Sequence, residues 1–516
     1  MPLLIRPNVG PCGCIALLAA ALIALGSIVP PALAVPGDML LRLHSDDVAP
    51  YASMFGEAIA AVGDDLLIGA PLTSFEAPFS GRAYLVDGKT GELRFEVHNP
   101  APFRDADFGA AVAAGPGVFA VGAPGSINAA YVFDADTGEM MNYLRHPDLD
   151  LAGGFGSSIA FLGDKVLVGS RADSIRDGPR QTCCRGAAYL YDGFTGQLVL
   201  PLRNPDPDTV RSFGFSIATF NGKLLVGTPR AENETGRNVG RVYVFNAATS
   251  QQLFTLENPV PQTGAGQNDF GDSLATLGNR VIVGAPDFPL AGLPIGGAAY
   301  VFDGATGDYV MALANPDPQL GDDFGHAVAA VENNILVGAP FNDVDGVRNA
   351  GSVYLFDGQA GELLLTIDNP DRRNAGFGMR LTALGNKIVV GAPFDAADET
   401  LTGFGTVYVF EGVPDIPVGD TDADGDVDID DLNAVRNHFG QFGPDDGTLP
   451  GDTWPYDGAV GIDDLNRIRN YFGNTRGPAA PVAEPATLVL AALAAFVTLI
   501  AGRRTWNAEV VKLSGR

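Results

Sequence analysis

Cysteine is scarce in this sequence, and its placement rules out a disulfide framework. Cys12 and Cys14 lie in an N-terminal apolar segment, and Cys183 and Cys184 are neighbours. Adjacent cysteines cannot connect distant segments of a chain. The fold must therefore depend on its hydrophobic core, and the pair either forms a strained vicinal disulfide or remains as two thiols.

Positive charge is scarce as well. The 516 residues include 32 Lys and Arg against 61 Asp and Glu, which gives a formal net charge of −29. A polyanion repels nucleic acid, so that class of partner is excluded. Charged residues make up only 18% of the chain, whereas Gly and Pro number 66 and 37. This composition favours many short strands joined by tight turns over long surface helices.

The sequence contains no recognisable catalytic motif. No His/Cys cluster has zinc spacing, and neither a G-x-S-x-G elbow nor a P-loop occurs. The five histidines are scattered, at His44, His98, His146, His326 and His438. We assign no catalytic residue and expect a protein without enzymatic activity. A glycosidase-like pair among the many carboxylates stays open as an alternative.

Residues 1–34 have the pattern of a secretory signal peptide. Arg6 precedes the apolar run Ile15–Ile28, and Ala32-Leu33-Ala34 matches an A-x-A cleavage site. We expect cleavage after Ala34 and export of the remaining chain. A retained helical anchor is the alternative.

A second apolar run, Ala486–Gly502, has 17 uncharged residues and is followed by Arg503-Arg504. It is just long enough to span a bilayer, and the arginines indicate a cytoplasmic flank. With Glu484-Pro485 before it, segment 486–504 resembles the PEP-CTERM sorting tail of Gram-negative bacteria. The resemblance implies a transmembrane helix that an exosortase removes, with the protein left at the cell surface, in the outer envelope or outside the cell. Ala483 replaces the family's first proline and the tail 505–516 is long, so a plain single-pass anchor is the alternative.

The region between the two ends repeats itself seven times, with a period of 47 to 58 residues. Each repeat has a Phe-Gly pair, a Gly that follows the Phe after 14 residues and opens "GAP" or a variant, and a Tyr. The phenylalanines are Phe55, Phe108, Phe155, Phe213, Phe270, Phe324 and Phe377. The GAP glycines are Gly69, Gly122, Gly169, Gly227, Gly284, Gly338 and Gly391. The tyrosines are Tyr84, Tyr131, Tyr189, Tyr243, Tyr300, Tyr354 and Tyr408.

Each repeat reads as two hairpins. In "FGDSLATLGNRVIVGAP" the turn Gly278-Asn279 separates two β-rich runs, and a Gly-rich turn at Asp303–Gly307 lies inside a second hairpin. Four antiparallel strands repeated radially make a β-propeller, so seven repeats predict seven blades over residues 38–412. The seventh repeat lacks a fourth strand, and residues Asp38–Asp47 can supply it and remove two unpaired edges. An open linear array is the alternative.

These motifs resemble the FG-GAP repeats of integrin α-subunit propellers. The resemblance implies a binding or adhesion protein of the cell surface, whose Phe-Gly, GAP and Tyr positions serve packing and turns. The calcium loop that many relatives carry before GAP is replaced here by short turns such as Asn221-Gly222 and Gly385-Asn386. The loops between GAP and Tyr vary in length and share a face with those leading to Phe-Gly, so we expect ligands there. Asp343 and Asp345 could chelate a cation on this face, or simply lie in a solvated loop.

After a linker at 413–418, the stretch "GDTDADGDVDIDDL" has the spacing of an EF-hand calcium loop. Its oxygen ligands would come from Asp420, Asp422, Asp424, Asp428 and Asp431 and from the carbonyl of Asp426. A disordered acidic linker is the alternative. Leu432, Val435 and Phe439 then repeat with helical spacing.

A related unit follows at Gly451–Gly473, with Asp452, Asp457 and Asp464 retained and one extra residue in its loop. Two loop–helix units over 419–473 resemble a dockerin type I domain, followed by a linker at 474–485. The resemblance implies calcium as cofactor and docking onto a cohesin-like module through Ile429, Asp430, Ile462 and Asp463. Dockerins often serve polysaccharide degradation. We therefore expect a mainly β protein with a small α-helical docking module and a C-terminal transmembrane helix. A dockerin-bearing enzyme or accessory subunit acting on polysaccharide is the alternative function.

Overall fold

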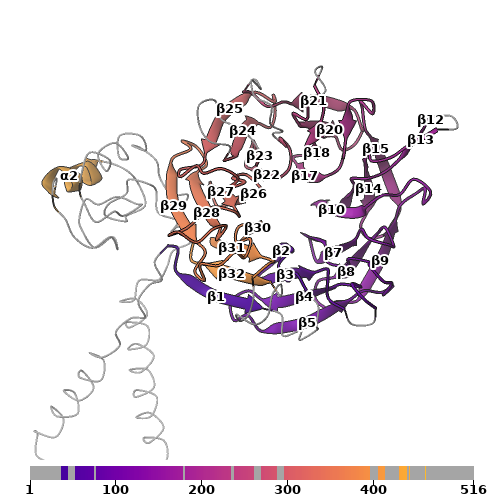
Figure 1. Ribbon diagram of the computed structural model, residues 1–516, viewed down its shortest axis with the longest axis horizontal. Coiled ribbons are helices and arrows are strands. Elements are labelled where there is room, and N and C mark those ends of the chain that lie inside the picture. The colour runs from indigo at the N-terminus through magenta and orange to yellow at the C-terminus, as the bar shows by residue number, and fades with distance from the viewer. Residues whose placement is uncertain are drawn as a thin grey trace, which may run out of the picture. The chain divides into compact units, whose positions relative to one another are not determined.

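The computed structural model describes residues 36–44, 53–74, 77–177, 180–233, 237–260, 269–286, 296–395, 405–412, 429–438, 441 and 460 (Figure 1). The chain divides into two compact units, Met1–Pro414 and Asp415–Arg516. The proposed signal peptide and sorting tail lie outside the described residues. Among those described, no helix has the length and apolar character needed to cross a membrane.

Seven four-stranded antiparallel sheets form the first unit, which confirms the predicted seven-bladed propeller. Blade 1 contains β2 (Ala58–Val62), β3 (Asp65–Ala70), β4 (Arg82–Asp87) and β5 (Leu93–His98). Blade 2 contains β6 (Ala111–Gly115), β7 (Val118–Ala123), β8 (Ala129–Asp134) and β9 (Met140–Arg145). Blade 3 contains β10 (Phe155–Leu162), β11 (Lys165–Ser170), β14 (Ala187–Asp192) and β15 (Leu198–Arg203). Blade 4 contains β17 (Ser216–Phe220), β18 (Lys223–Thr228), β20 (Arg241–Asn246) and β21 (Gln252–Leu256).

The remaining blades follow the same order. Blade 5 contains β22 (Leu274–Leu277), β23 (Arg280–Ala285), β24 (Ala298–Asp303) and β25 (Tyr309–Ala314). Blade 6 contains β26 (Ala327–Val331), β27 (Asn334–Ala339), β28 (Ser352–Asp357) and β29 (Leu363–Asp368). Blade 7 contains β30 (Arg380–Leu384), β31 (Lys387–Ala392), β32 (Thr406–Phe410) and β1 (Met39–His44). Two small two-stranded sheets lie outside the blades: β12 (Ile175–Asp177) with β13 (Arg180–Thr182), and β16 (Val210–Arg211) with β19 (Arg230–Ala231).

Strand position within a blade explains the sequence pattern. The second and third strands are the middle strands of each blade, and both of their faces pack against neighbouring blades. They are buried along almost their whole length and therefore read as continuous apolar runs such as "VFAVGA" in β7. The fourth strands alternate between exposed and buried side chains, as in β9 and β25, because one of their faces meets solvent. The first strands surround the centre of the ring (Figure 1).

The Phe-Gly and GAP motifs form the contact between one blade and the next. Each GAP glycine lies so close to the Phe-Gly glycine of the following blade that an added Cβ would clash with its carbonyl oxygen. The last such contact, between Gly391 and Gly56, joins blade 7 to blade 1. Each Phe of Phe-Gly is almost fully buried, with its ring centroid 5.5 to 5.9 Å from that of the Tyr in its own blade. These positions are packing residues, as the sequence predicts.

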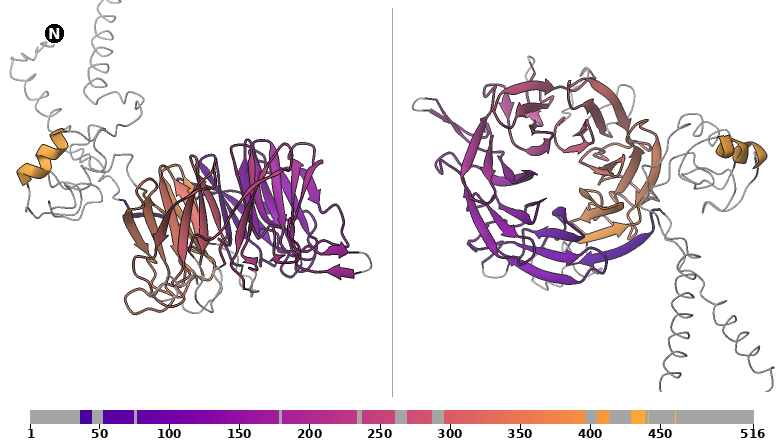
Figure 2. Two further views of the ribbon diagram at one scale, coloured as in Figure 1. Left: turned by 90° about the horizontal axis from the view of Figure 1, so that it is seen from above. Right: turned by 180° about the vertical axis from the view of Figure 1, so that it is seen from behind.

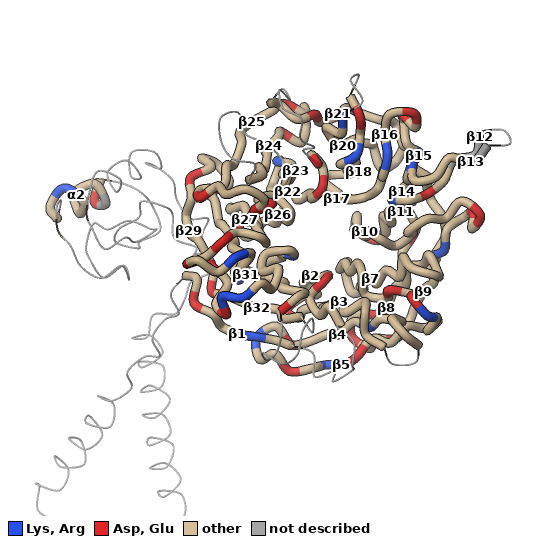
Figure 3. The backbone as a smooth tube through the Cα atoms, in the orientation of Figure 1, with Lys and Arg blue, Asp and Glu red and all other residues tan. Residues whose placement is uncertain are grey.

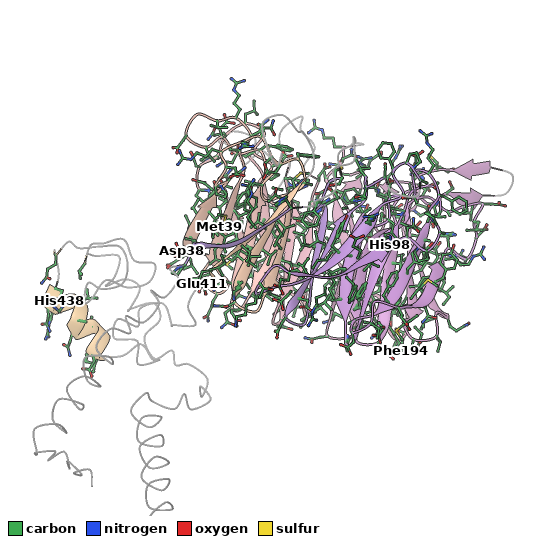
Figure 4. The ribbon with its side chains drawn as sticks, turned by 90° about the horizontal axis from the view of Figure 1, so that it is seen from below. Asp38, Met39, His98, Phe194, Glu411 and His438 are labelled. Atoms are coloured by element: carbon green, nitrogen blue, oxygen red, sulfur yellow. The ribbon has the colours of Figure 1, made fainter. Side chains whose placement is uncertain are left out.

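The first strand completes the last blade. β1 pairs antiparallel with β32 from Met39 opposite Phe410 to His44 opposite Thr406. The Glu411 amide donates to the Asp38 carbonyl at 2.8 Å, where the two strands meet (Figure 4). This pairing covers the free edge of β32 and closes the ring, as expected from the missing fourth strand of the seventh repeat.

The described part of the second unit centres on helix α2 (Ile429–His438). Val435 is buried and Leu432 is half-buried, in agreement with the predicted apolar face, whereas Phe439 lies outside the described residues. The amide of Val460, which is also buried, donates to the carbonyl of Gln441 at 3.0 Å. This bond connects the first predicted loop–helix segment with the second.

Candidate functional site

The loops between strands 2 and 3 and those leading to the next Phe-Gly emerge from one face of the propeller, which we call the long-loop face. In five blades the fourth strand is followed by an Asn-Pro pair, whose Asn fixes the base of the following loop: Asn99, Asn204, Asn258, Asn315 and Asn369. Asn99 accepts the Ala101 amide at 2.9 Å and donates to the Ser80 carbonyl at 2.9 Å. Asn369 makes the equivalent bonds with Asp371 and Ala350. Rigid bases of this kind allow the loops above them to differ without loss of the fold.

His146 takes the place of this Asn in blade 2. Its Nδ1 accepts the Asp148 amide at 3.0 Å, so Nε2 carries the proton and donates to Asp173 Oδ2 at 2.7 Å. Tyr189 also donates to Asp173, at 2.8 Å, and burial raises the pKa of its hydroxyl well above the ordinary value. The imidazole and the carboxylate are both almost completely buried. The group is a satisfied structural network, in which His146 substitutes for the Asn.

A second group, at the centre of the ring, differs between blades. The residue directly after each Phe-Gly is half-buried in all seven blades and lies at the start of the innermost strand. It is Ala110, Ser157 and Phe215 in blades 2 to 4, but Asp272, His326 and Glu57 in blades 5, 6 and 1. In blade 7 it is Met379, and Arg380 follows. We call Glu57, Asp272, His326 and Arg380 the axial cluster.

The axial cluster is a chain of contacts across four consecutive blades. Arg380 Nη2 pairs with Glu57 Oε1 at 2.5 Å, and Arg380 Nη1 lies 3.5 Å from His326 Nε2. His326 Nδ1 in turn lies 3.9 Å from Asp272 Oδ2. Glu57 Oε2 is buried without a hydrogen-bond partner, so one carboxylate oxygen keeps its capacity to accept.

The electrostatics of the cluster keep His326 neutral. An arginine donates only, so His326 Nε2 faces Arg380 with its lone pair and Nδ1 carries the proton. Burial, together with the positive charge of Arg380, lowers the pKa of His326 from 6.5 to about 4. This cluster is not predicted when the seven repeats are taken as equivalent. Its sequence signal is the variation of the residues one and two places after each Phe-Gly.

A pocket of about 440 Å³ opens between β1 and blade 1. Its walls include Arg42, Arg82 and Glu96. Arg82 Nη1 pairs with Glu96 Oε2 at 3.1 Å, and Arg42 Nη2 pairs with Asp371 Oδ2 at 2.5 Å. Because these charges already neutralise one another within the chain, we place the candidate site at the long-loop face and its axial cluster.

The two proposed cation ligands of this face, Asp343 and Asp345, interact with other groups of the chain. Asp345 Oδ2 lies 2.8 Å from Arg372 Nη1, and Asp343 Oδ1 accepts the Asn349 amide at 2.9 Å. Across the described part of the chain, no three His, Cys, Asp or Glu residues group in a way that could hold a metal ion. Asp343 and Asp345 as cation ligands stay a prediction.

The calcium loop falls mainly outside the described residues. The residues outside the described part include two predicted docking residues, Ile462 and Asp463, and eight predicted ligands: Asp420, Asp422, Asp424, Asp426, Asp428, Asp452, Asp457 and Asp464. Asp431 lies in the first turn of α2, which begins at Ile429. The side chains of Ile429 and Asp430 are exposed at the start of this helix, where the predicted docking surface would be.

Cys183 and Cys184 are two free thiols beside the strand β13. Their Sγ atoms are 2.9 Å apart, and Cys184 has a positive φ of 64°. The hydrogen bond with Cys183, together with burial, raises the pKa of Cys184. The structure thus shows the reduced form of the two that the sequence left open.

Comparison with known proteins supports the propeller. The family model described as the FG-GAP repeat matches residues 310–356, from β25 to β28. No curated protein matches the chain. Together with the seven repeated blades, this match over one repeat supports an FG-GAP-type β-propeller for the first unit.

Proposed function

We propose that this protein is an exported, non-catalytic binding or adhesion protein of the cell surface, which uses the long-loop face for its ligand. One observation supports the proposal most. The blades share a single framework, yet four consecutive blades place unlike polar residues, three of them charged, in contact at the centre of the ring. Such a polar group among variable loops suits the recognition of an external ligand.

The acidic unit is proposed to hold the protein in place through calcium. The residues Asp420, Asp422, Asp424, Asp428 and Asp431 would supply side-chain oxygens, with the carbonyl of Asp426. The start of α2 at Ile429 supports this, because it places Asp431 in the first helical turn, where a closing carboxylate of such a loop belongs. Exposed Ile429 supports docking onto a cohesin-like module or another surface protein. Segment 486–504 would anchor the chain in the membrane at least until an exosortase acts on it.

Calcium titration tests the docking half of this proposal. The double variant Asp422→Ala/Asp424→Ala should lose the tighter calcium-binding event seen by isothermal titration calorimetry. The variant Asp445→Ala/Asp446→Ala removes the same charge from the same unit outside the loop and should retain it. Equal loss in both variants, or no calcium binding by the wild type, would contradict the proposal.

Ligand capture tests the binding half. The exported protein should bind glycans or surface proteins, and alanine substitutions on the long-loop face should weaken that binding. If these variants bind every partner as wild type does, the assignment of the ligand site to the long-loop face is wrong.

Hydrolysis of polysaccharide is the second candidate function, favoured by the two carboxylates of the axial cluster. Glu57 and Asp272 meet at the centre of the ring through Arg380 and His326. Turnover on a glycan panel, abolished by Glu57→Gln or Asp272→Asn, would establish it. Binding without turnover would favour the first proposal.

A further inference from the structure

Cationic residues concentrate in one sector of an otherwise acidic protein. Residues 171–241 contain ten of the 32 Lys and Arg residues and seven acidic ones, although the whole chain has a net charge of −29. The sector runs from the loop after β11 to the start of β20, in blades 3 and 4, and basic segments are visible beside β16 and β18 (Figure 3). A polyanion that approaches this protein meets attraction here and repulsion over much of the remainder.

Two arginines face each other at the middle of this sector. β16 pairs with β19 so that Arg211 lies directly opposite Arg230, and both residues are exposed. Like charges in direct cross-strand register are destabilising. The only carboxylate that offsets them within the described chain is Glu232, whose Oε1 lies 3.6 Å from Arg211 Nε. A local conflict of this kind, with no stabilising gain for the fold, is typical of a functional position.

The backbone that presents the two arginines is held firmly. Val210 and Ala231, the other pair of the two-strand ladder, are fully buried. Thr228 Oγ1 donates to the Arg211 carbonyl at 2.7 Å. The two guanidinium groups therefore extend from a fixed base, and an anion would not have to order the strands that carry them.

Further arginines extend the basic surface on both sides of this pair. Arg185 lies on one side: its neighbour Cys184 accepts the Ser212 amide at 3.1 Å, and Arg185 Nη1 donates to the Asp208 carbonyl at 3.2 Å. Toward the centre of the ring, the guanidinium of Arg171 lies 5.6 Å from the ring centroid of Phe215. The ribbon β12–β13 projects from the rim in the same loop as Arg171 and Arg185 (Figure 2). The surface thus offers several cations and one aromatic ring along the long-loop face.

We propose that Arg211 and Arg230 form an anion-binding clamp for the carboxylate or sulfate groups of an acidic polysaccharide. Paired guanidinium groups suit planar carboxylates and sulfates because each presents a fork of N–H donors. A polymer with repeated charges can contact the clamp and the neighbouring arginines together, and its sugar rings can pack against Phe215. The inference rests on the proposed function, since it names the ligand of the long-loop face.

Binding of polygalacturonate and dextran sulfate, with neutral dextran as reference, tests the clamp. Full-length wild type should bind both acidic polymers in affinity electrophoresis, and the binding should weaken as sodium chloride is raised. The variant Arg211→Gln/Arg230→Gln should bind at least about tenfold more weakly, because two charge-assisted contacts are lost. The variant Arg104→Gln/Arg348→Gln removes the same charge from exposed loops of the same face in other blades. It should stay within about twofold of wild type.

Each alternative result would overturn the clamp. Equal weakening in both double variants would show a general charge effect. Stronger binding of polyglutamate than of any acidic glycan would point to an acidic protein partner instead. Wild type that binds neutral glycans but no acidic polymer would refute the clamp and leave the proposed function standing. Thermal denaturation of both variants checks that a loss of binding does not come from unfolding.

Discussion

Replacing His326 by glutamine should remove part of the acid sensitivity of the propeller. His326 lies between Arg380, whose Nη1 is 3.5 Å from Nε2, and Asp272, whose Oδ2 is 3.9 Å from Nδ1. Its side chain is 22% exposed. A proton on Nε2 would bring an imidazolium against a guanidinium in a poorly solvated place, and the pKa of His326 is accordingly lowered to about 4.

The sign and size of the effect follow from this lowered pKa. Between pH 6.5 and about 4 the unfolded chain takes up a proton at this histidine and the folded chain does not. The free energy of unfolding therefore falls as the pH is lowered through this window. A shift from 6.5 to about 4 corresponds to at most roughly 3 kcal/mol. A glutamine side chain binds no proton, so the variant His326→Gln should lose this contribution to the pH dependence.

Urea denaturation between pH 7 and pH 4 measures the effect. Trp454 and Trp506 are the two tryptophans of the sequence and lie outside the propeller, so far-UV circular dichroism is the suitable signal. The stability of wild type relative to His326→Gln should fall by up to about 3 kcal/mol across the window. His98→Gln, at a side chain that is 52% exposed, serves as control and should follow wild type. Parallel pH profiles for wild type and His326→Gln would refute the reasoning.

Three further predictions concern the framework. Burial raises the pKa of Asp322 from 3.8 to about 6, so the folded state binds this proton more tightly than the unfolded state and loses stability as the pH rises through this range. In urea denaturation, Asp322→Asn should therefore stabilise the protein by up to about 3 kcal/mol at pH 7 and by little at pH 4. Deletion of residues 36–44 removes β1 and leaves β32 with a free edge, so size-exclusion chromatography should show oligomers or aggregates where wild type is monodisperse. Phe324→Ala empties a fully buried position whose ring lies 5.6 Å from Tyr354, and it should lower the free energy of unfolding by about 3–5 kcal/mol; a loss below about 1 kcal/mol would contradict the packing role.

The sequence predicted the blades well because its repeated residues are the contacts between blades. The spacing from Phe-Gly to GAP is constant since the GAP glycine of one blade touches the Phe-Gly glycine of the next. The second and third strands read as apolar runs since both of their faces are buried. The last repeat lacks a fourth strand, and an unpaired strand edge needs a partner, so the sequence also predicted that β1 pairs with β32.

The candidate site was harder to predict, because ring closure creates it. Glu57 and Arg380 are 323 positions apart, and only the closed ring of seven blades brings them into contact. Arg211 and Arg230 meet through a ladder of two residue pairs, which is too short to leave an alternating pattern. The long loop between the GAP and Tyr positions of blade 3 contains the ribbon β12–β13, which the sequence pattern does not predict. The repeats thus predict the framework, whereas the polar contacts of the candidate site join residues that are far apart in the sequence.

The position after Phe-Gly explains how one framework can carry different chemistry in each blade. The glycine before it is fixed by the close contact with the neighbouring blade, so the backbone enters the first strand in the same way seven times. The side chain that follows is only half-buried and lies near the centre of the ring, so alanine, serine, phenylalanine, methionine and charged residues all fit there. Substitution at this position should therefore alter ligand recognition at a small cost in stability, whereas substitution of the Phe two places earlier costs a fully buried aromatic ring. Because the proposed recognition and the stability depend on different residues of the same motif, we expect substitutions in the axial cluster to change the proposed ligand preference without disturbing the fold.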